Sequence, residues 1–181
     1  MLATVVSGSL TEGLVVRITP ETPLEHIKTG KFVSIIGETH TFFSLITDLQ
    51  LQVTMPEVVQ FPPNSNETLL QETLQRKFMY ATAVLKPMLM LDQSKRPQPV
   101  KTIPPHFAPV YEAREHDISH IFGEDTGKTS QHFMIGTPLD MQAPVCINLA
   151  RLAERSNGIF GKTGTGKTFI TRIVLSGLIQ R

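Results

Sequence analysis

One short segment limits the possible folds of this chain more than any other. Residues Gly161 to Thr168 read GKTGTGKT and match the pattern G-x-x-x-x-G-K-[ST] of a phosphate-binding loop. Such a loop needs a strand before it and a helix after it, because its backbone N–H groups must point at phosphate oxygens near a helix N-terminus. The segment therefore predicts a βα unit, with a chance match of a Gly-rich loop as the alternative.

Both flanks of this segment fit the prediction. Residues 158–160 are a plausible strand end, and residues 167–179 carry apolar side chains at helical spacing. The apolar stripe of the predicted helix consists of Phe169, Ile170, Ile173, Val174 and Leu178. We expect this stripe to pack on the barrel described below, to pair with another chain or to stay mobile, because the rest of a sheet is not present in the sequence.

The residue types in the loop indicate nucleotide phosphates and Mg²⁺ as ligands. The glycines allow backbone conformations and a close approach that side chains would block. The Lys167 ammonium is expected to reach the β- and γ-phosphates, and the Thr168 hydroxyl to ligate Mg²⁺, so the predicted cofactors are ATP and Mg²⁺. The predicted binding residues are Gly161, Lys162, Thr163, Gly164, Thr165, Gly166, Lys167 and Thr168. No residue is assigned a catalytic role.

Three other patterns imitate functional sites. Residues 122–129 end in Gly-Lys-Thr, but the first glycine comes one residue too late and a helix is expected before it, which favours a plain loop. Asp92 follows an apolar stretch, as the Mg²⁺-positioning carboxylate of P-loop enzymes does. It lies before the loop, however, and a role in Mg²⁺ binding would require a circularly permuted order of the two motifs. His116 and His120 have the spacing of two metal ligands on one helix face, but without a third ligand solvated surface histidines are favoured.

The first half of the chain has the pattern of a small all-β module. Short segments rich in β-branched residues alternate with turn residues, which is typical of a barrel or sandwich. The candidate strands are residues 3–6, 13–18, 32–36, 42–52, 58–61 and 78–85. Asn66 can cap a short helix over residues 67–75. We predict an up-and-down or Greek-key barrel over about residues 1–90.

The second half begins with a connector and leads to the phosphate-binding segment. Prolines crowd the connector, which leaves room for an edge strand at residues 108–113 and a short helix up to Phe122. Two short strands are expected at residues 132–135 and 145–149, followed by one helical turn from Ala150. We therefore predict a mainly β fold with two parts. Residues 1–140 form a β-barrel module with its connector and flanking short helices, and residues 141–181 form the first βα unit of an incomplete α/β P-loop ATPase domain.

Composition excludes some classes of protein. The chain has 181 residues, 40% of them hydrophobic and 18% charged, which is typical of soluble globular proteins. The formal net charge of +1 lacks the basic excess of a nucleic-acid-binding domain. The apolar runs are far shorter than the roughly 20 residues of a membrane span, and the N-terminus lacks the features of a secretory signal. We expect a cytoplasmic protein without membrane contact, in which Cys146 is a buried, inert thiol.

Catalysis requires more than the predicted loop. A P-loop ATPase also uses a downstream carboxylate, a residue that orients water and usually an arginine from a neighbour. Thirteen residues follow Thr168, which is room for one helix. We therefore expect that this chain alone does not turn over ATP.

With these motifs, the chain resembles the HerA-type ATPases of the HerA/FtsK group. The resemblance rests most specifically on the segment from Asn157 to Thr168, and less specifically on Gly8 and on residues 30–35 in the β module. It implies a small N-terminal barrel, similar in type to one in ATP synthase subunits, that helps to assemble hexameric rings. It also implies that DNA is bound through a downstream core and that some members work with a NurA-type nuclease.

Three functional hypotheses follow. The first is the N-terminal portion of a HerA-like, ATP-driven DNA translocase or helicase, in which the barrel serves assembly and the loop binds ATP phosphates. The second is a non-catalytic barrel that acts in assembly or partner contact as an isolated chain. The third is a P-loop kinase or GTPase of another class with an N-terminal barrel.

Overall fold

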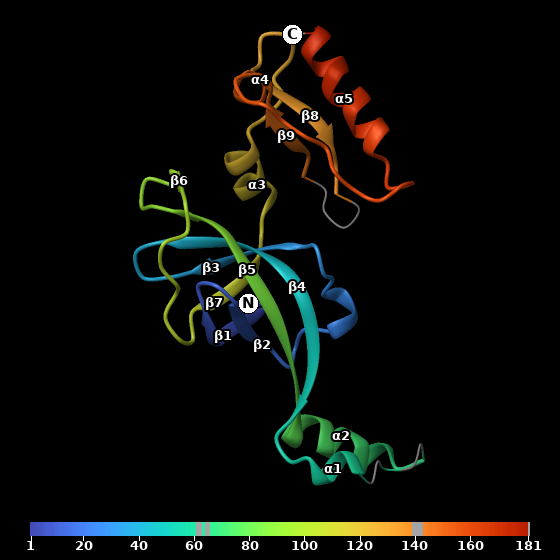
Figure 1. Cartoon of the computed structure of the whole chain (residues 1–181). Coiled ribbons are helices and arrows are strands. Elements are labelled where there is room, and N and C mark those ends of the chain that lie inside the picture. Colours follow the sequence, from blue (N-terminus) through green and yellow to red (C-terminus); the bar gives the residue numbers. More distant parts are fainter. Residues whose placement is uncertain (61–62, 64–65, 139–142, 181) are drawn as a thin grey trace. The chain divides into compact units, whose positions relative to one another are not determined.

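A computed structural model describes residues 1–60, 63, 66–138 and 143–180 of the chain (Figure 1). The fold is mainly β, as predicted. The chain forms two compact units, Met1–Ala113 and Arg114–Arg181. The predicted boundary at residue 141 lies outside the described residues, and the division of the chain into a barrel module and the start of an ATPase domain stays a prediction.

The first unit is a closed antiparallel barrel. Its strands are β1 (Ala3–Ser9), β2 (Gly13–Ile18), β3 (Phe32–Ile36), β4 (Thr41–Val53), β5 (Met79–Leu91) and β7 (Pro109–Glu112), with the short β6 (Pro97–Gln98) beside the end of β5. The order is β2-β1-β7-β3-β4-β5, and pairing of β2 with β5 closes the ring. The predicted barrel is thus confirmed, and closure removes the open edges that a flat sheet would expose.

Strand β7 differs from its prediction. An edge strand was expected at residues 108–113, and a complete barrel was expected by about residue 90. Instead, β7 lies between β1 and β3 and pairs with both of them. The physical reason is that β1 and β3 do not pair with each other, so only a later segment can take up the backbone groups between them. The barrel therefore needs the chain up to Glu112.

The barrel core follows from alternation along the strands. Because successive side chains point to opposite faces, alternate apolar residues fill the interior. The buried cluster includes Ala3, Val5, Leu14, Val16, Ile18, Val33, Ile35, Phe42, Ile46, Ala83, Leu85 and Val110. Burial of this apolar surface is the main force that stabilises the unit.

The β4–β5 hairpin extends beyond the barrel and carries two helices at its tip (Figure 1). Helix α1 is Glu57–Gln60 and helix α2 is Thr68–Phe78. The helix expected over residues 67–75 is therefore confirmed, whereas the strand expected at residues 58–61 is wrong over its described part. The Val58 and Val59 amides donate to carbonyls three residues earlier, so the backbone is satisfied locally without a partner strand. Residues 47–60, 63, 66–74 and 77–80, whose burial the structure describes, include no buried residue.

In its described residues, the second unit contains a small hairpin and three α-helices. These elements are α3 (Glu115–Phe122), β8 (His132–Gly136), β9 (Val145–Asn148), α4 (Leu149–Ala153) and α5 (Lys167–Gln180). Strands β8 and β9 pair antiparallel, α3 and α4 contact β9, and α5 contacts β8. These positions agree with the predicted strands and helices, and residues 139–142 between β8 and β9 lie outside the described residues. A 3₁₀ turn, η1 (Leu24–His26), completes the elements of the described chain.

Two further expectations can be compared with the described residues. Cys146 on β9 is buried, and burial raises the pKa of its thiol, as expected for an inert cysteine. In the described part of the chain, no helix is long and apolar enough to cross a lipid bilayer.

Candidate functional site

The candidate site is the loop from Gly161 to Gly166 and the first turn of α5. Gly164 and Gly166 have φ angles of 85° and 83°, in the left-handed region that favours glycine. The Gly166 carbonyl accepts hydrogen bonds from the Phe169 and Ile170 amides, both at 3.0 Å, and thereby starts the helix. The two glycines thus turn the chain tightly into the N-terminus of α5.

The carbonyl of Lys162 is the centre of the loop's hydrogen bonds. The Thr165 hydroxyl donates to it at 2.7 Å and the Thr165 amide at 3.3 Å. The Lys167 ammonium also donates to it at 2.5 Å. The side chain of Lys167 therefore folds back over the loop and places its positive charge where the loop closes.

The electrostatics of the site suit an anion. The first turn of α5 contains no acidic residue, so the positive end of the helix dipole is not compensated there. Lys167 is half-buried, whereas the loop residues and Thr168 are exposed and open to a ligand. The Thr168 hydroxyl is a hard oxygen donor of the kind that Mg²⁺ accepts, so the residues present fit a phosphate with its cation.

The segment before the loop departs from its prediction. Residues 158–160 were expected to end a strand, but they form no strand, and Phe160 is 93% exposed. A strand needs a neighbour to take up its backbone hydrogen bonds, and no strand pairs with this segment among the described residues. Asn157 closes the preceding turn instead, since its side-chain amide donates to the carbonyls of Leu152 and Arg155.

Helix α5 has the predicted position and only part of the predicted packing. Ile173 and Val174 are half-buried, and Gly177 lies buried against Phe133 of β8. The other stripe residues, Phe169, Ile170 and Leu178, are exposed. The helix therefore contacts β8 through its C-terminal half and leaves apolar side chains uncovered near the loop.

The second Gly-Lys-Thr pattern forms a plain loop, as predicted. Residues 123–131 follow α3 and contain no helix or strand. Asp125 organises this loop, because its carboxylate accepts hydrogen bonds from the amides of Gly127 and Met134 at 3.1 and 3.2 Å. A carboxylate at the centre of a loop makes it a poor site for a phosphate.

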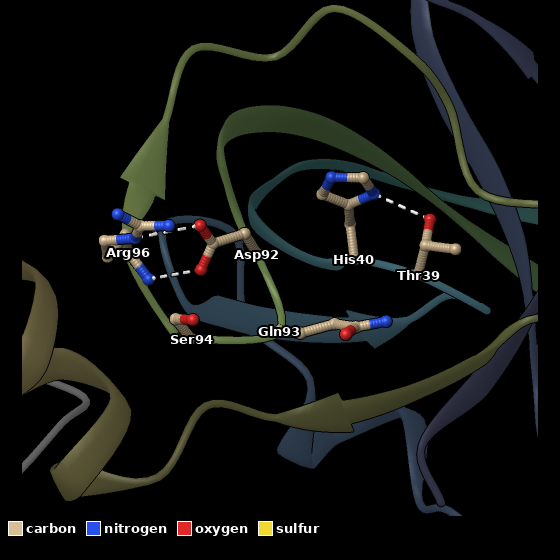
Figure 2. Close-up of a pocket in the computed structure, with 6 residues that line it drawn as sticks. All are labelled: Thr39, His40, Asp92, Gln93, Ser94 and Arg96. Atoms are coloured by element: carbon tan, nitrogen blue, oxygen red, sulfur yellow. Dashed lines mark hydrogen bonds and ion pairs between the residues drawn. The ribbon is translucent and has the colours of Figure 1, made fainter.

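Asp92, the second of the three patterns that resemble functional sites, lies in the turn between β5 and β6 and forms hydrogen bonds within that turn (Figure 2). Its carboxylate accepts hydrogen bonds from the Arg96 amide at 2.9 Å, the Arg96 guanidinium at 3.1 Å and the Gln98 amide group at 3.2 Å. The bond from the Arg96 amide, with the guanidinium charge, lowers the pKa of this carboxyl. Thr39 and His40 of the β3–β4 turn line the same shallow depression. Asp92 therefore stabilises a hairpin turn of the barrel.

His116 and His120 form the third pattern that resembles a functional site. The rings of His116 and His120 stack on α3 with their centroids 6.3 Å apart. Among the described residues, no group of three or more His, Cys, Asp or Glu side chains is placed to hold a metal ion. The two histidines therefore have the spacing of metal ligands without the rest of a metal site.

Sequence reasoning missed the side chain of Thr165. In the motif, any side chain is allowed at this position, and only the backbone amide has a role. In the structure, the Thr165 hydroxyl donates a hydrogen bond to the Lys162 carbonyl. A hydroxyl three residues after the carbonyl that it contacts is a turn signal that could have indicated the bond.

A comparison with known proteins matches the region that contains the loop. Residues 133–181, from β8 to the end of α5, match the family model described as "Helicase HerA, central domain". No curated protein matches the chain significantly. The match and the closed N-terminal barrel confirm the predicted resemblance to a HerA-type ATPase.

Proposed function

We propose that this chain is part of a HerA-type ATPase, that its loop binds the phosphates of ATP with Mg²⁺ and that its barrel serves assembly. The observation that carries the proposal is the loop geometry within the matched region. Two left-handed glycines turn the chain into a helix N-terminus, and a lysine ammonium already lies over the loop. These are the features by which a backbone cradle binds a phosphate.

Each loop residue has a role in this proposal. The amides of residues 162–164 and 166–168 would donate to phosphate oxygens, and the Lys167 ammonium would turn toward the β- and γ-phosphates with the N–H donors that the Lys162 carbonyl does not use. The Thr168 hydroxyl would ligate Mg²⁺. The cation held there would supply neutralisation of the phosphate charge. Lys162 and Thr163 would contribute mainly backbone amides.

We further propose that the whole protein is a DNA translocase or helicase that assembles as a hexamer. Hydrolysis needs a carboxylate, a water-orienting residue and an arginine, and we assign these to the core of the parent protein. The net charge of +1 gives no support for DNA contact by this chain, so DNA would bind to that core. A NurA-type nuclease is the proposed partner in DNA-end processing, and the cytoplasm is the proposed location.

One observation favours a second candidate function, a barrel that acts only in assembly. The tip of the β4–β5 hairpin has no buried residue among those described, and Leu51 and Leu69 are about four-fifths exposed, at 80% and 81%. The tip also exposes Met55, Val59 and Leu70, and exposed apolar side chains gathered in one region are typical of contact surfaces. No comparable feature favours a kinase or a GTPase, and the matched family is a helicase domain.

The proposal is tested by calorimetric titration of ATP with Mg²⁺. We expect Lys167→Ala to weaken binding by at least about tenfold, because a hydrogen bond to a charged group contributes about 1.5–3 kcal/mol. Lys128→Ala is the matched control, since Lys128 stands in the other Gly-Lys-Thr pattern, and it should bind like the wild type. The same variants in a longer protein that includes the downstream core separate binding from hydrolysis.

Two outcomes would decide against parts of the proposal. If Lys167→Ala binds ATP as tightly as the wild type in both lengths of protein, the loop is not a phosphate site. If only the longer protein binds ATP, the loop requires the core, and the isolated chain is an assembly module.

A further inference from the structure

We propose that Thr165 is a positioning residue whose hydroxyl holds the phosphate-binding loop in shape before a nucleotide arrives. That the Thr165 hydroxyl holds the loop in shape is argued from the hydrogen bonds of the loop. That this shape serves nucleotide binding rests on the proposed function. The motif itself gives the Thr165 side chain no such role.

The first observation is that Thr165 closes the loop with two donors. Its hydroxyl donates to the Lys162 carbonyl at 2.7 Å, and its amide donates to the same oxygen at 3.3 Å. The amide bond alone is long for a hydrogen bond, whereas the hydroxyl bond has ordinary length. The side chain therefore makes the stronger of the two contacts that close this turn.

The second observation concerns the space beside Gly161. A Cβ atom placed on Gly161 would lie 2.8 Å from the Thr165 hydroxyl oxygen, which is too close for a real contact. The absence of a side chain at Gly161 thus leaves the place that the hydroxyl occupies. Glycine at position 161 therefore leaves the room that the Thr165 hydroxyl needs to reach the Lys162 carbonyl.

The third observation is that Lys167 shares the same acceptor. Its ammonium donates to the Lys162 carbonyl at 2.5 Å in the structure. An ammonium has three N–H donors, so Lys167 can turn toward a phosphate while it keeps this bond or after it gives the bond up. In the second case, a carbonyl that lost all its donors would favour opening of the turn. Because the Thr165 hydroxyl stays on the carbonyl, Lys167 can move to the phosphate while the loop keeps its shape.

Preorganisation of this kind raises affinity, because less backbone freedom is lost when the ligand binds. Serine at position 165 retains the hydroxyl, whereas valine retains the branched shape and removes the donor. Thr171→Val is the matched control, since Thr171 makes an ordinary helical bond to the Lys167 carbonyl at 2.9 Å, outside the loop.

The mechanism is tested on the whole chain without nucleotide, by backbone ¹⁵N relaxation of Gly164, Thr165 and Gly166. We expect Thr165→Val to lower the order parameters of these amides from values near those of rigid backbone, about 0.85, toward those of a flexible loop, below about 0.6. Thr165→Ser and Thr171→Val should leave them unchanged. Equal order parameters in Thr165→Val and in the wild type overturn the proposal.

Its consequence is tested by titrating ATP with Mg²⁺ into the same four proteins and into Lys167→Ala. We expect Thr165→Val to weaken binding about tenfold and Thr165→Ser to restore it to within about twofold of the wild type. If Lys167→Ala loses binding while Thr165→Val binds normally, the loop binds phosphate and the positioning role is wrong. If no protein binds ATP, the proposed function fails for this chain, and the relaxation data alone decide whether Thr165 holds the loop.

Discussion

At the scale of single residues, the least expected side chain of the barrel is that of Ser44. It lies on β4, opposite Val33 of β3, and is completely buried in the apolar interior. Its hydroxyl has no hydrogen-bond partner among the described residues. An unsatisfied buried hydroxyl costs about 1–3 kcal/mol, so this residue lowers the free energy of unfolding of the barrel.

We therefore expect Ser44→Ala to stabilise the chain by about 1 kcal/mol, because alanine removes the unsatisfied oxygen and leaves only a small gap. The measurement is urea unfolding followed by far-UV circular dichroism. The control is Ser94→Ala in the exposed β5–β6 turn, which should change stability by less than about 0.5 kcal/mol. Clear destabilisation by Ser44→Ala would mean that the hydroxyl has a structural partner.

The residues of the loop show what can be predicted at this scale. The left-handed glycines at 164 and 166 follow from the motif, since a tight turn into a helix allows few residue types. The bond from Lys167 to the Lys162 carbonyl does not follow from it, because the motif assigns this ammonium to phosphates. The Thr165 hydroxyl bond could not be derived with the same certainty, because it depends on how close the two ends of the loop come. Ser44 was also not predictable, since alternation fixes the face of a residue but not its hydrogen bonds.

At the scale of elements, α5 and β8 meet through one glycine. Gly177 is buried, and a Cβ atom at this position would lie 2.7 Å from Cδ1 and 2.9 Å from Cγ of Phe133. Glycine within a helix costs about 0.5–1 kcal/mol relative to alanine, so the helix alone would favour alanine. The close contact opposes that preference.

We expect the contact to dominate, because overpacking costs about 1–3 kcal/mol. Gly177→Ala should displace the Phe133 ring and increase amide hydrogen exchange in α5. In the Phe133→Ala background the same substitution should decrease exchange, since only the helix preference remains. This change of sign is the internal control. Decreased exchange in both backgrounds would show that α5 does not pack on β8 through Gly177.

Helices and strands were predictable where the local sequence pattern determines the structure. They were not predictable where the structure depends on pairing with a distant strand. The helical spacing of residues 167–179 predicts α5 within one residue of its observed end. The segment at residues 158–160 looks like a strand, yet it lacks a neighbour in the described chain and forms none. Likewise, residues 58–61 have strand-forming side chains, but their described part lies in a helix, where the backbone is satisfied locally.

At the scale of the whole molecule, the barrel depends on a strand that is distant in sequence. β7 follows the Pro-rich connector, yet it fills the gap between β1 and β3. The Leu2 amide donates to the Val110 carbonyl at 2.8 Å on one side of β7, and the Ala113 amide donates to the Phe32 carbonyl at 3.1 Å on the other. Val110 is completely buried in the core. Local pattern predicts a strand here but cannot place it in the ring.

This arrangement predicts where the chain can be cut. A fragment of residues 1–113 should unfold cooperatively in urea, because it retains all six strands of the ring. A fragment of residues 1–100 should not, since β1 and β3 would each expose an open edge and the core would lose Val110. Far-UV circular dichroism and light scattering measure both effects, with aggregation expected only for the shorter fragment.

A third fragment, residues 1–140, should unfold at the same urea concentration as residues 1–113, because α3 lies in the other unit. If residues 1–100 unfold with that same midpoint, β7 is not needed to close the barrel. If residues 1–140 are clearly more stable than residues 1–113, the connector and α3 belong to the barrel module, as its predicted extent of 1–140 implies.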